Sequence, residues 1–131
     1  MTTVNLIEYE AANDAVRTVY DDIRATRKTD FINNFWKALA NNPEQLRRTW
    51  EGVKSVMAPG ALDALTKELI YIAVSVANSC EYCIHSHTAA ARAKGMTAEQ
   101  HAELLAVIGM AFHTNGLVHT LQVEVDAAFK L

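Results

Sequence analysis

Two cysteines and a histidine on one predicted helical face are the strongest chemical signal in this sequence. Cys80 and Cys83 are separated by two residues, and His87 follows Cys83 by four. At about 100° per residue these three side chains fall within about 60° of one another, whereas Tyr82 and His85 point away. Backbone N–H groups and the dipole at a helix start stabilise a thiolate. The pattern favours a redox site in which the thiols can form a short-loop disulfide and His87 serves them as a proton acceptor or donor.

Two other interpretations of the cysteine pair stay open on spacing alone. Cys80, Cys83 and His87 could supply three ligands to a zinc ion, but a fourth is not obvious, because the sequence has no third cysteine and no H-x-x-x-H pair elsewhere. The pair could also be two inert buried thiols.

The residues around the pair predict where its helix begins. Asn78 is a good N-cap, and Glu81 three positions later can complete a capping-box-like pair. This assignment puts Cys80 in the first turn of the helix, close to unpaired backbone N–H donors.

Composition limits the class of protein and its partners. The chain has 131 residues, of which 50% are hydrophobic, so we predict a single domain over residues 1–131. A net charge of -3 without a basic stripe argues against nucleic acid as a partner. No secretory signal is visible, and the apolar run 69–77 is about half of what a bilayer requires, so no membrane association is expected. We therefore expect a cytoplasmic protein, where a cysteine pair is more often catalytic or metal-binding than structural.

Hydrophobic spacing predicts an all-α chain. Only 2 prolines and 5 glycines occur, and strand-like alternation of apolar and polar residues is absent. Trp36 and Trp50 are expected to anchor a core or an interface. The buried face of the first helix is expected to contain Ala12, Val16, Val19, Tyr20 and Ile23. The predicted helices cover about residues 8–27, 31–39, 43–56, 62–77, 78–94 and 97–129, with a glycine stop at Lys94-Gly95 and a capping box at Thr97 and Gln100.

Glu68 occupies an unusual place for a carboxylate, at the entrance to an apolar helix and flanked by Leu65 and Ile72. As a partly solvated first-turn residue it would complement the helix dipole. As a functional residue it would be a general base of raised pKa. The residues alone leave both interpretations open.

The arrangement of Glu68, an apolar helix, the segment 80–83 and His87 resembles the E-x(11)-C-x-x-C-x-x-x-H core of the alkylhydroperoxidase D-like proteins of the carboxymuconolactone decarboxylase superfamily. The turn at 94–97 and the stretch 109–115 are also similar to that family, so the resemblance covers roughly residues 43–126. It implies an all-α, single compact domain of about six to seven helices, with a helix-turn-helix that carries the cysteines and a last helix that continues through Asn115.

The resemblance also implies a function and its residues. In that family the glutamate, both cysteines and the histidine form a thiol peroxidase site with a proton relay, which assigns Glu68, Cys80, Cys83 and His87 as catalytic residues. Tyr82 stands where the prototype has a histidine, and it is expected to be an auxiliary residue that relays protons less readily. The expected partners are a peroxide substrate, an external dithiol reductant and further copies of the chain in a trimer or hexamer. No cofactor and no metal ion are expected.

Alternatives remain for the attacking cysteine and for the function. First-turn placement favours Cys80 as the attacking thiol, but the family and the i+4 partner His87 favour Cys83, which we predict. The alternative enzyme is a lactone decarboxylase-type acid-base catalyst using Glu68 and His87, although such members generally lack the cysteine pair. The alternative that is not an enzyme is a zinc-bound or structural helical module that binds a partner.

Overall fold

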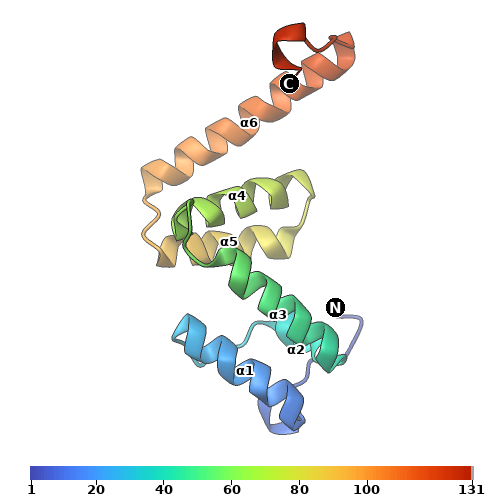
Figure 1. The fold of residues 1–131 in the computed structure, drawn as a ribbon, viewed down its shortest axis with the longest axis vertical. Helices are drawn as coiled ribbons and strands as arrows, with labels where there is room; N and C mark the ends of the chain where they lie inside the picture. The colour runs from blue at the N-terminus through green and yellow to red at the C-terminus, as the bar shows by residue number, and fades with distance from the viewer. Residues whose placement is uncertain (131) are drawn as a thin grey trace. The chain divides into compact units, whose positions relative to one another are not determined.

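A computed structural model describes residues 1–130, and over that range the chain is all-α, as predicted. It forms two compact units, an N-terminal unit of residues 1–58 and a C-terminal unit from residue 59 onward. The prediction that they make one domain stays a prediction. In chain order the elements are η1 (Tyr9–Ala11), α1 (Asp14–Arg27), α2 (Asn34–Leu39), α3 (Pro43–Met57), α4 (Ala64–Ala77), α5 (Glu81–Ala93), α6 (Ala98–Leu121) and η2 (Ala127–Phe129) (Figure 1).

An apolar core with two tryptophans holds the N-terminal unit together. Trp36 and Trp50 meet edge to face with their ring centroids 5.5 Å apart, and Trp50 Nε1 donates a hydrogen bond to Asp22 at 2.6 Å. Both tryptophans are core anchors, in agreement with the prediction. The buried residues of this core are Ala12, Val16, Val19, Tyr20, Ile23, Ile32, Trp36, Ala40, Leu46 and Trp50.

Asparagine side chains cap the starts of α1 and α3, and the cap of α1 shortens the first predicted helix. Asn13 caps α1 by accepting a hydrogen bond from the Val16 N–H, so residues 9–11 form a separate 3-10 turn. The helix predicted from about residue 8 therefore begins later. α3 begins at Pro43, as predicted, because proline needs no N–H partner in the first turn.

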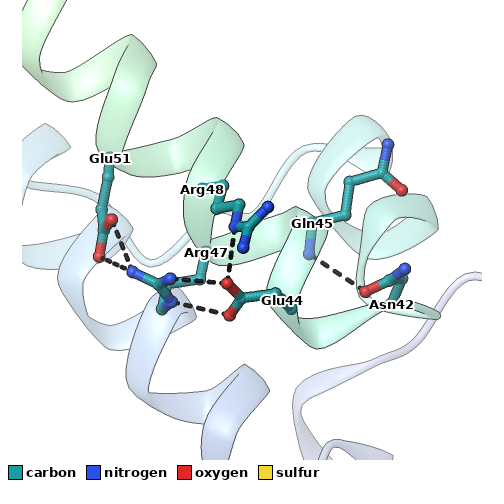
Figure 2. Close-up of polar contacts among 6 residues, drawn as sticks. All are labelled: Asn42, Glu44, Gln45, Arg47, Arg48 and Glu51. Carbon is teal, nitrogen blue, oxygen red and sulfur yellow. Dashed lines mark hydrogen bonds and ion pairs between the residues drawn. The ribbon is translucent and has the colours of Figure 1, made fainter.

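Charged residues cover the exposed face of α3 (Figure 2). Arg47 pairs with both Glu44 and Glu51 at 2.8 Å, and Arg48 pairs with Glu44 at 2.7 Å. Hydrogen bonds from Arg47 and then Arg48 lower the pKa of Glu44 to about 2. These i,i+3 and i,i+4 pairs are solvent-exposed, so they support the helix without building a core.

In the C-terminal unit, α4 and α5 pack against each other (Figure 1). α4 begins at Ala64, two residues later than predicted, because the Asp63 side chain caps it by accepting from the Thr66 N–H at 2.8 Å. The core of this unit has three buried apolar residues, and partly buried residues pack against them. The buried residues are Ile72, Ala91 and Met96; the partly buried residues are Leu65, Leu69, Val76, Leu104 and Ile108.

The predicted start of the cysteine helix is wrong. Asn78 is the C-cap of α4, and its backbone N–H donates to Val74 O. Ser79 then adopts a left-handed conformation with φ 53°, which separates the two helices. Cys80 itself is the N-cap of α5, and its sulfur accepts a hydrogen bond from the Cys83 N–H at 3.3 Å. The capping pattern failed because α4 ends on the same asparagine that could have begun α5.

The helix α6 runs unbroken through Asn115, as the family resemblance implied. It begins with the predicted capping box of Thr97 and Gln100. It ends at Leu121, before Gln122 in a left-handed conformation, and not near residue 129. By length and composition α6 could cross a membrane. No part of its most apolar stretch of 18 residues is buried among the described residues. One such helix is weak evidence for a membrane protein.

Candidate functional site

A disulfide joins Cys80 and Cys83 across the first turn of α5, with their Cα atoms 5.3 Å apart. Cys80 caps the helix and Cys83 lies in its first turn, so both sulfurs are at the positive end of the α5 dipole. Both residues are partly exposed. The two cysteines are therefore paired within the chain and accessible to small reagents.

Glu68 is a buried carboxylate with one partner from α5 and one from the C-cap of that helix. It lies in the second turn of α4 and is 4% exposed. Its Oε2 is 2.7 Å from His87 Nδ1, and its Oε1 accepts from Lys94 Nζ at 2.9 Å. Charge-assisted hydrogen bonds of this length are the strong ones. Glu68 is thus not a solvated first-turn residue, and it links α4 to α5.

The pKa of Glu68 moves in the direction opposite to the sequence-based hypothesis. Burial acts to raise this pKa, but hydrogen bonds from His87 and Lys94, together with the Lys94 charge, outweigh burial and lower it below the ordinary value. The raised pKa expected for Glu68 from its apolar surroundings is therefore wrong, because two donors that follow it in the chain stabilise the carboxylate anion. Near neutral pH Glu68 is an anion that accepts hydrogen bonds.

His87 is held on one edge and one face. Because Glu68 is anionic, His87 Nδ1 carries the proton of their hydrogen bond, which leaves Nε2 as the nitrogen able to accept another. The Tyr71 ring from α4 stacks on the imidazole, with centroids 3.6 Å apart and planes 19° apart. His87 follows Cys83 by one helical turn on α5, so the fixed imidazole belongs to the same helix as the thiols.

Sequence reasoning missed Lys94 and Tyr71 as parts of this site. In the sequence, Lys94 was assigned only to the glycine stop at the end of its helix, yet it also pairs with Glu68. Its spacing of seven residues from His87 puts both side chains on one face of α5, a signal that could have found it. Tyr71 follows Glu68 by three residues on α4, which likewise puts the two side chains on neighbouring positions.

The other residues of this helix that the sequence singled out are more exposed. Tyr82, between the cysteines, is 46% exposed, and His85 is exposed as well. Within residues 1–130, no group of three or more His, Cys, Asp or Glu side chains is arranged to hold a metal ion. The site therefore consists of the cysteine pair, His87 and the residues that fix the imidazole.

This chain is similar to a protein family, to two bacterial proteins and to a solved structure. The model of the carboxymuconolactone decarboxylase family matches residues 43–123. Uncharacterised protein 4 in the cox locus of Paracoccus denitrificans is 41% identical over 81 residues, which is 57% of this chain and 72% of that protein. An uncharacterised protein of Cupriavidus necator is 37% identical over 83 residues, which is 63% of this chain and 73% of that protein. The crystal structure of an alkylhydroperoxidase AhpD core from Rhodospirillum rubrum is 60% identical, with a TM-score of 0.97 over 100% of this chain and 98% of that one.

Proposed function

This chain belongs to the carboxymuconolactone decarboxylase family, and from that premise we propose that it is a thiol-dependent peroxidase acting on hydrogen peroxide or organic hydroperoxides. The Cys80–Cys83 disulfide carries the proposal, because a cysteine pair that closes within one helical turn can deliver the two electrons that a peroxide accepts. The likeness to an alkylhydroperoxidase core over the whole chain supports the same reaction.

In the first step, the Cys83 thiolate attacks one oxygen of the peroxide. The O–O bond breaks, the sulfur becomes a sulfenic acid, and the other oxygen leaves as an alkoxide or hydroxide that takes up a proton. His87 Nε2 accepts the thiol proton of Cys83 and returns it to the leaving oxygen. Glu68 takes no proton itself, since its lowered pKa makes it a weak base; it holds His87 in the required tautomer.

In the second step, Cys80 attacks the sulfenic acid, so that the disulfide forms and water is released. The N-cap position of Cys80 supports this role, because the Cys83 N–H and the helix dipole stabilise a thiolate there. An external dithiol then reduces the disulfide and is itself oxidised. We propose that this occurs in the cytoplasm, where such reductants are maintained.

Single cysteine substitutions test this reaction. We expect Cys80→Ser and Cys83→Ser each to abolish peroxide consumption coupled to a dithiol reductant, because neither can form the disulfide. A sulfenic-acid trap should label Cys83 in Cys80→Ser, whereas Cys83→Ser should stay unlabelled after peroxide. Wild-type consumption by both variants would contradict the peroxidase proposal. Labelling of Cys80 in Cys83→Ser would contradict the order of attack.

We also propose that copies of the chain associate through α6, in a trimer or hexamer as the resemblance implies. Large apolar side chains on this helix are exposed within the chain, among them Leu105, Val107, Met110, Phe112, Leu117, Val118 and Leu121. The polar run 113–115 lies in the same helix, and it would be costly in hydrocarbon but can be hydrogen-bonded in a protein interface. Light scattering in detergent-free buffer should give the mass of an oligomer; a stable monomer at micromolar concentration would contradict the proposal.

A further inference from the structure

The end of α5 fixes the position of Lys94. Gly95 has φ 93°, a left-handed conformation that side chains disfavour, and it turns the chain away from the helix axis. Lys94, immediately before it, is the C-cap residue, and its backbone N–H donates to Ala90 O and Ala91 O. The backbone of Lys94 is thus anchored, and its side chain contacts Glu68 on α4.

Each oxygen of the Glu68 carboxylate is paired with a different residue, one with Lys94 and the other with His87. Lys94 Nζ occupies Oε1 and His87 Nδ1 occupies Oε2, at 2.9 and 2.7 Å. With a donor on each oxygen, the carboxylate has one favoured orientation, in which Oε2 faces the imidazole. The Lys94 side chain is 39% exposed and Glu68 is buried, so the ammonium remains partly hydrated while it neutralises a buried anion.

Few other charges act on this pair. The groups that contact or perturb Glu68 are His87 from α5 and Lys94 from its C-cap, and Tyr71 from α4 covers the His87 ring. Along the described part of α6, no side chain forms an ion pair with Glu68. Arg92 lies on the same helix as Lys94, is also exposed and forms no ion pair or side-chain hydrogen bond within residues 1–130, so it offers a matched cation for comparison.

We propose that Lys94 is a positioning residue for the thiol chemistry: it keeps Glu68 ionised and oriented toward His87, and thereby keeps His87 Nε2 as the proton acceptor for Cys83. This inference rests on the proposed function, because it requires that His87 serve the thiols. It assigns a role to a lysine that acts on the imidazole through Glu68.

Loss of Lys94 has a specific consequence for pH dependence. Without the ammonium, only His87 opposes the effect of burial, so the Glu68 carboxylate takes up a proton at higher pH than in the wild type. A neutral carboxyl group no longer stabilises the Nδ1–H tautomer of His87, so thiol reactivity falls on the acidic side. Removing one close opposite charge shifts a carboxyl pKa by about one unit or more, and we expect the acidic limb of the reactivity profile to move up by about one pH unit.

The test measures the reaction of the reduced, full-length protein with 4,4′-dithiodipyridine between about pH 4 and pH 8, a range that spans the ordinary pKa values of Glu and His. Lys94→Met and Lys94→Gln should both move the acidic limb upward. Lys94→Arg, which keeps the charge and a donor, should restore the wild-type profile, and Arg92→Met should leave it unchanged. In a Glu68→Gln background, Lys94→Met should have no additional effect, because Lys94 acts through Glu68.

Three results would overturn the inference: a Lys94→Met profile that superposes on the wild type, an equal loss of rate at every pH that Lys94→Arg does not rescue, or a shift of the same size in Arg92→Met. Because this readout uses no peroxide, it tests the role of Lys94 in thiol reactivity separately from peroxide reduction. The predicted shift in a protein that consumes no peroxide would support the role of Lys94 and contradict the peroxidase proposal alone.

Discussion

The N-terminal and C-terminal units bury different kinds of residue. The N-terminal unit has a ten-residue apolar core, and its ion pairs lie on the surface. The C-terminal unit has three buried apolar residues and the buried carboxylate of Glu68, and it exposes most of a 24-residue apolar helix. The first unit is built for packing, whereas the second uses part of its interior for a polar site.

This difference has a physical consequence for the second unit. A buried carboxylate is tolerated only when its partners are present, and removing one partner costs more than the pair contributes. Correct pairing of Glu68 with His87 and Lys94 therefore matters for the folded state as well as for chemistry. The exposed apolar side chains of α6 would lose contact with water in the proposed association with further copies of the chain.

The largest effect on stability is expected from the apolar core. Leu46 is fully buried, so Leu46→Ala should lower the free energy of unfolding by about 2–5 kcal/mol through lost burial and a residual cavity. Leu62 is 49% exposed and provides the matched control. Leu62→Ala should change the free energy of unfolding by less than about 0.5 kcal/mol. Urea unfolding at one protein concentration measures both. Equal losses of unfolding free energy in the two variants would contradict the account that the buried core around Leu46 stabilises the fold.

The next effect concerns chemistry in the C-terminal unit. Glu68→Gln keeps the size of the side chain but removes the anion that orients His87, so thiol reactivity should fall by roughly 10²-fold, or about 2.7 kcal/mol. His87→Gln should act similarly, and the double variant should lose less than the sum, since the residues act as a unit. Alkylation rates against pH give the comparison, with Glu99→Gln, an exposed carboxylate on α6, as control. An unchanged thiol profile in Glu68→Gln would make Glu68 purely structural.

The smallest effect is a pH dependence of stability. The pKa of Glu68 is lower in the folded protein than its ordinary value of 4.5, so below that value the unfolded state binds more protons. The stabilisation from ionised Glu68 is complete above about pH 4.5 and is lost as the pH falls through the folded pKa. The difference in unfolding free energy between wild type and Glu68→Gln should therefore be constant near neutral pH and change below about pH 4.5. A difference that stays constant down to about pH 3 would show that Glu68 is not held as an anion.

Local signals in the sequence predicted most helices and several of their ends. Pro43 at the start of α3 and the capping box of Thr97 and Gln100 act through neighbours within a few residues, so they can be recognised without a structure. Asn78 shows the limit of such signals, since an asparagine can end one helix as readily as begin the next. The left-handed Ser79 between the helices carries no sequence signature of its own.

The site was predictable in its residue types but not in its electrostatics. Helical spacing and the family resemblance select Glu68, the cysteine pair and His87. The structure joins the two cysteines and hydrogen-bonds Glu68 to His87, while the catalytic roles of these residues stay predictions. The direction of the Glu68 pKa depends on Lys94, 26 residues away in the chain, and on how α4 packs on α5. Pairing between two helices leaves no periodic pattern within either helix. The sequence therefore suggested His87 as a relay partner of Glu68 only through the family resemblance, and it gave no indication of the contact with Lys94.

The most direct test of the central claim is a single turnover of the reduced protein with one equivalent of peroxide. The proposed reaction predicts that one peroxide is consumed for each disulfide formed, that both thiols of a chain are lost together, and that mass spectrometry finds a loss of two hydrogens in a peptide linking Cys80 to Cys83. Thiols that survive millimolar-scale peroxide, or a disulfide mainly between chains, would contradict the dithiol peroxidase account.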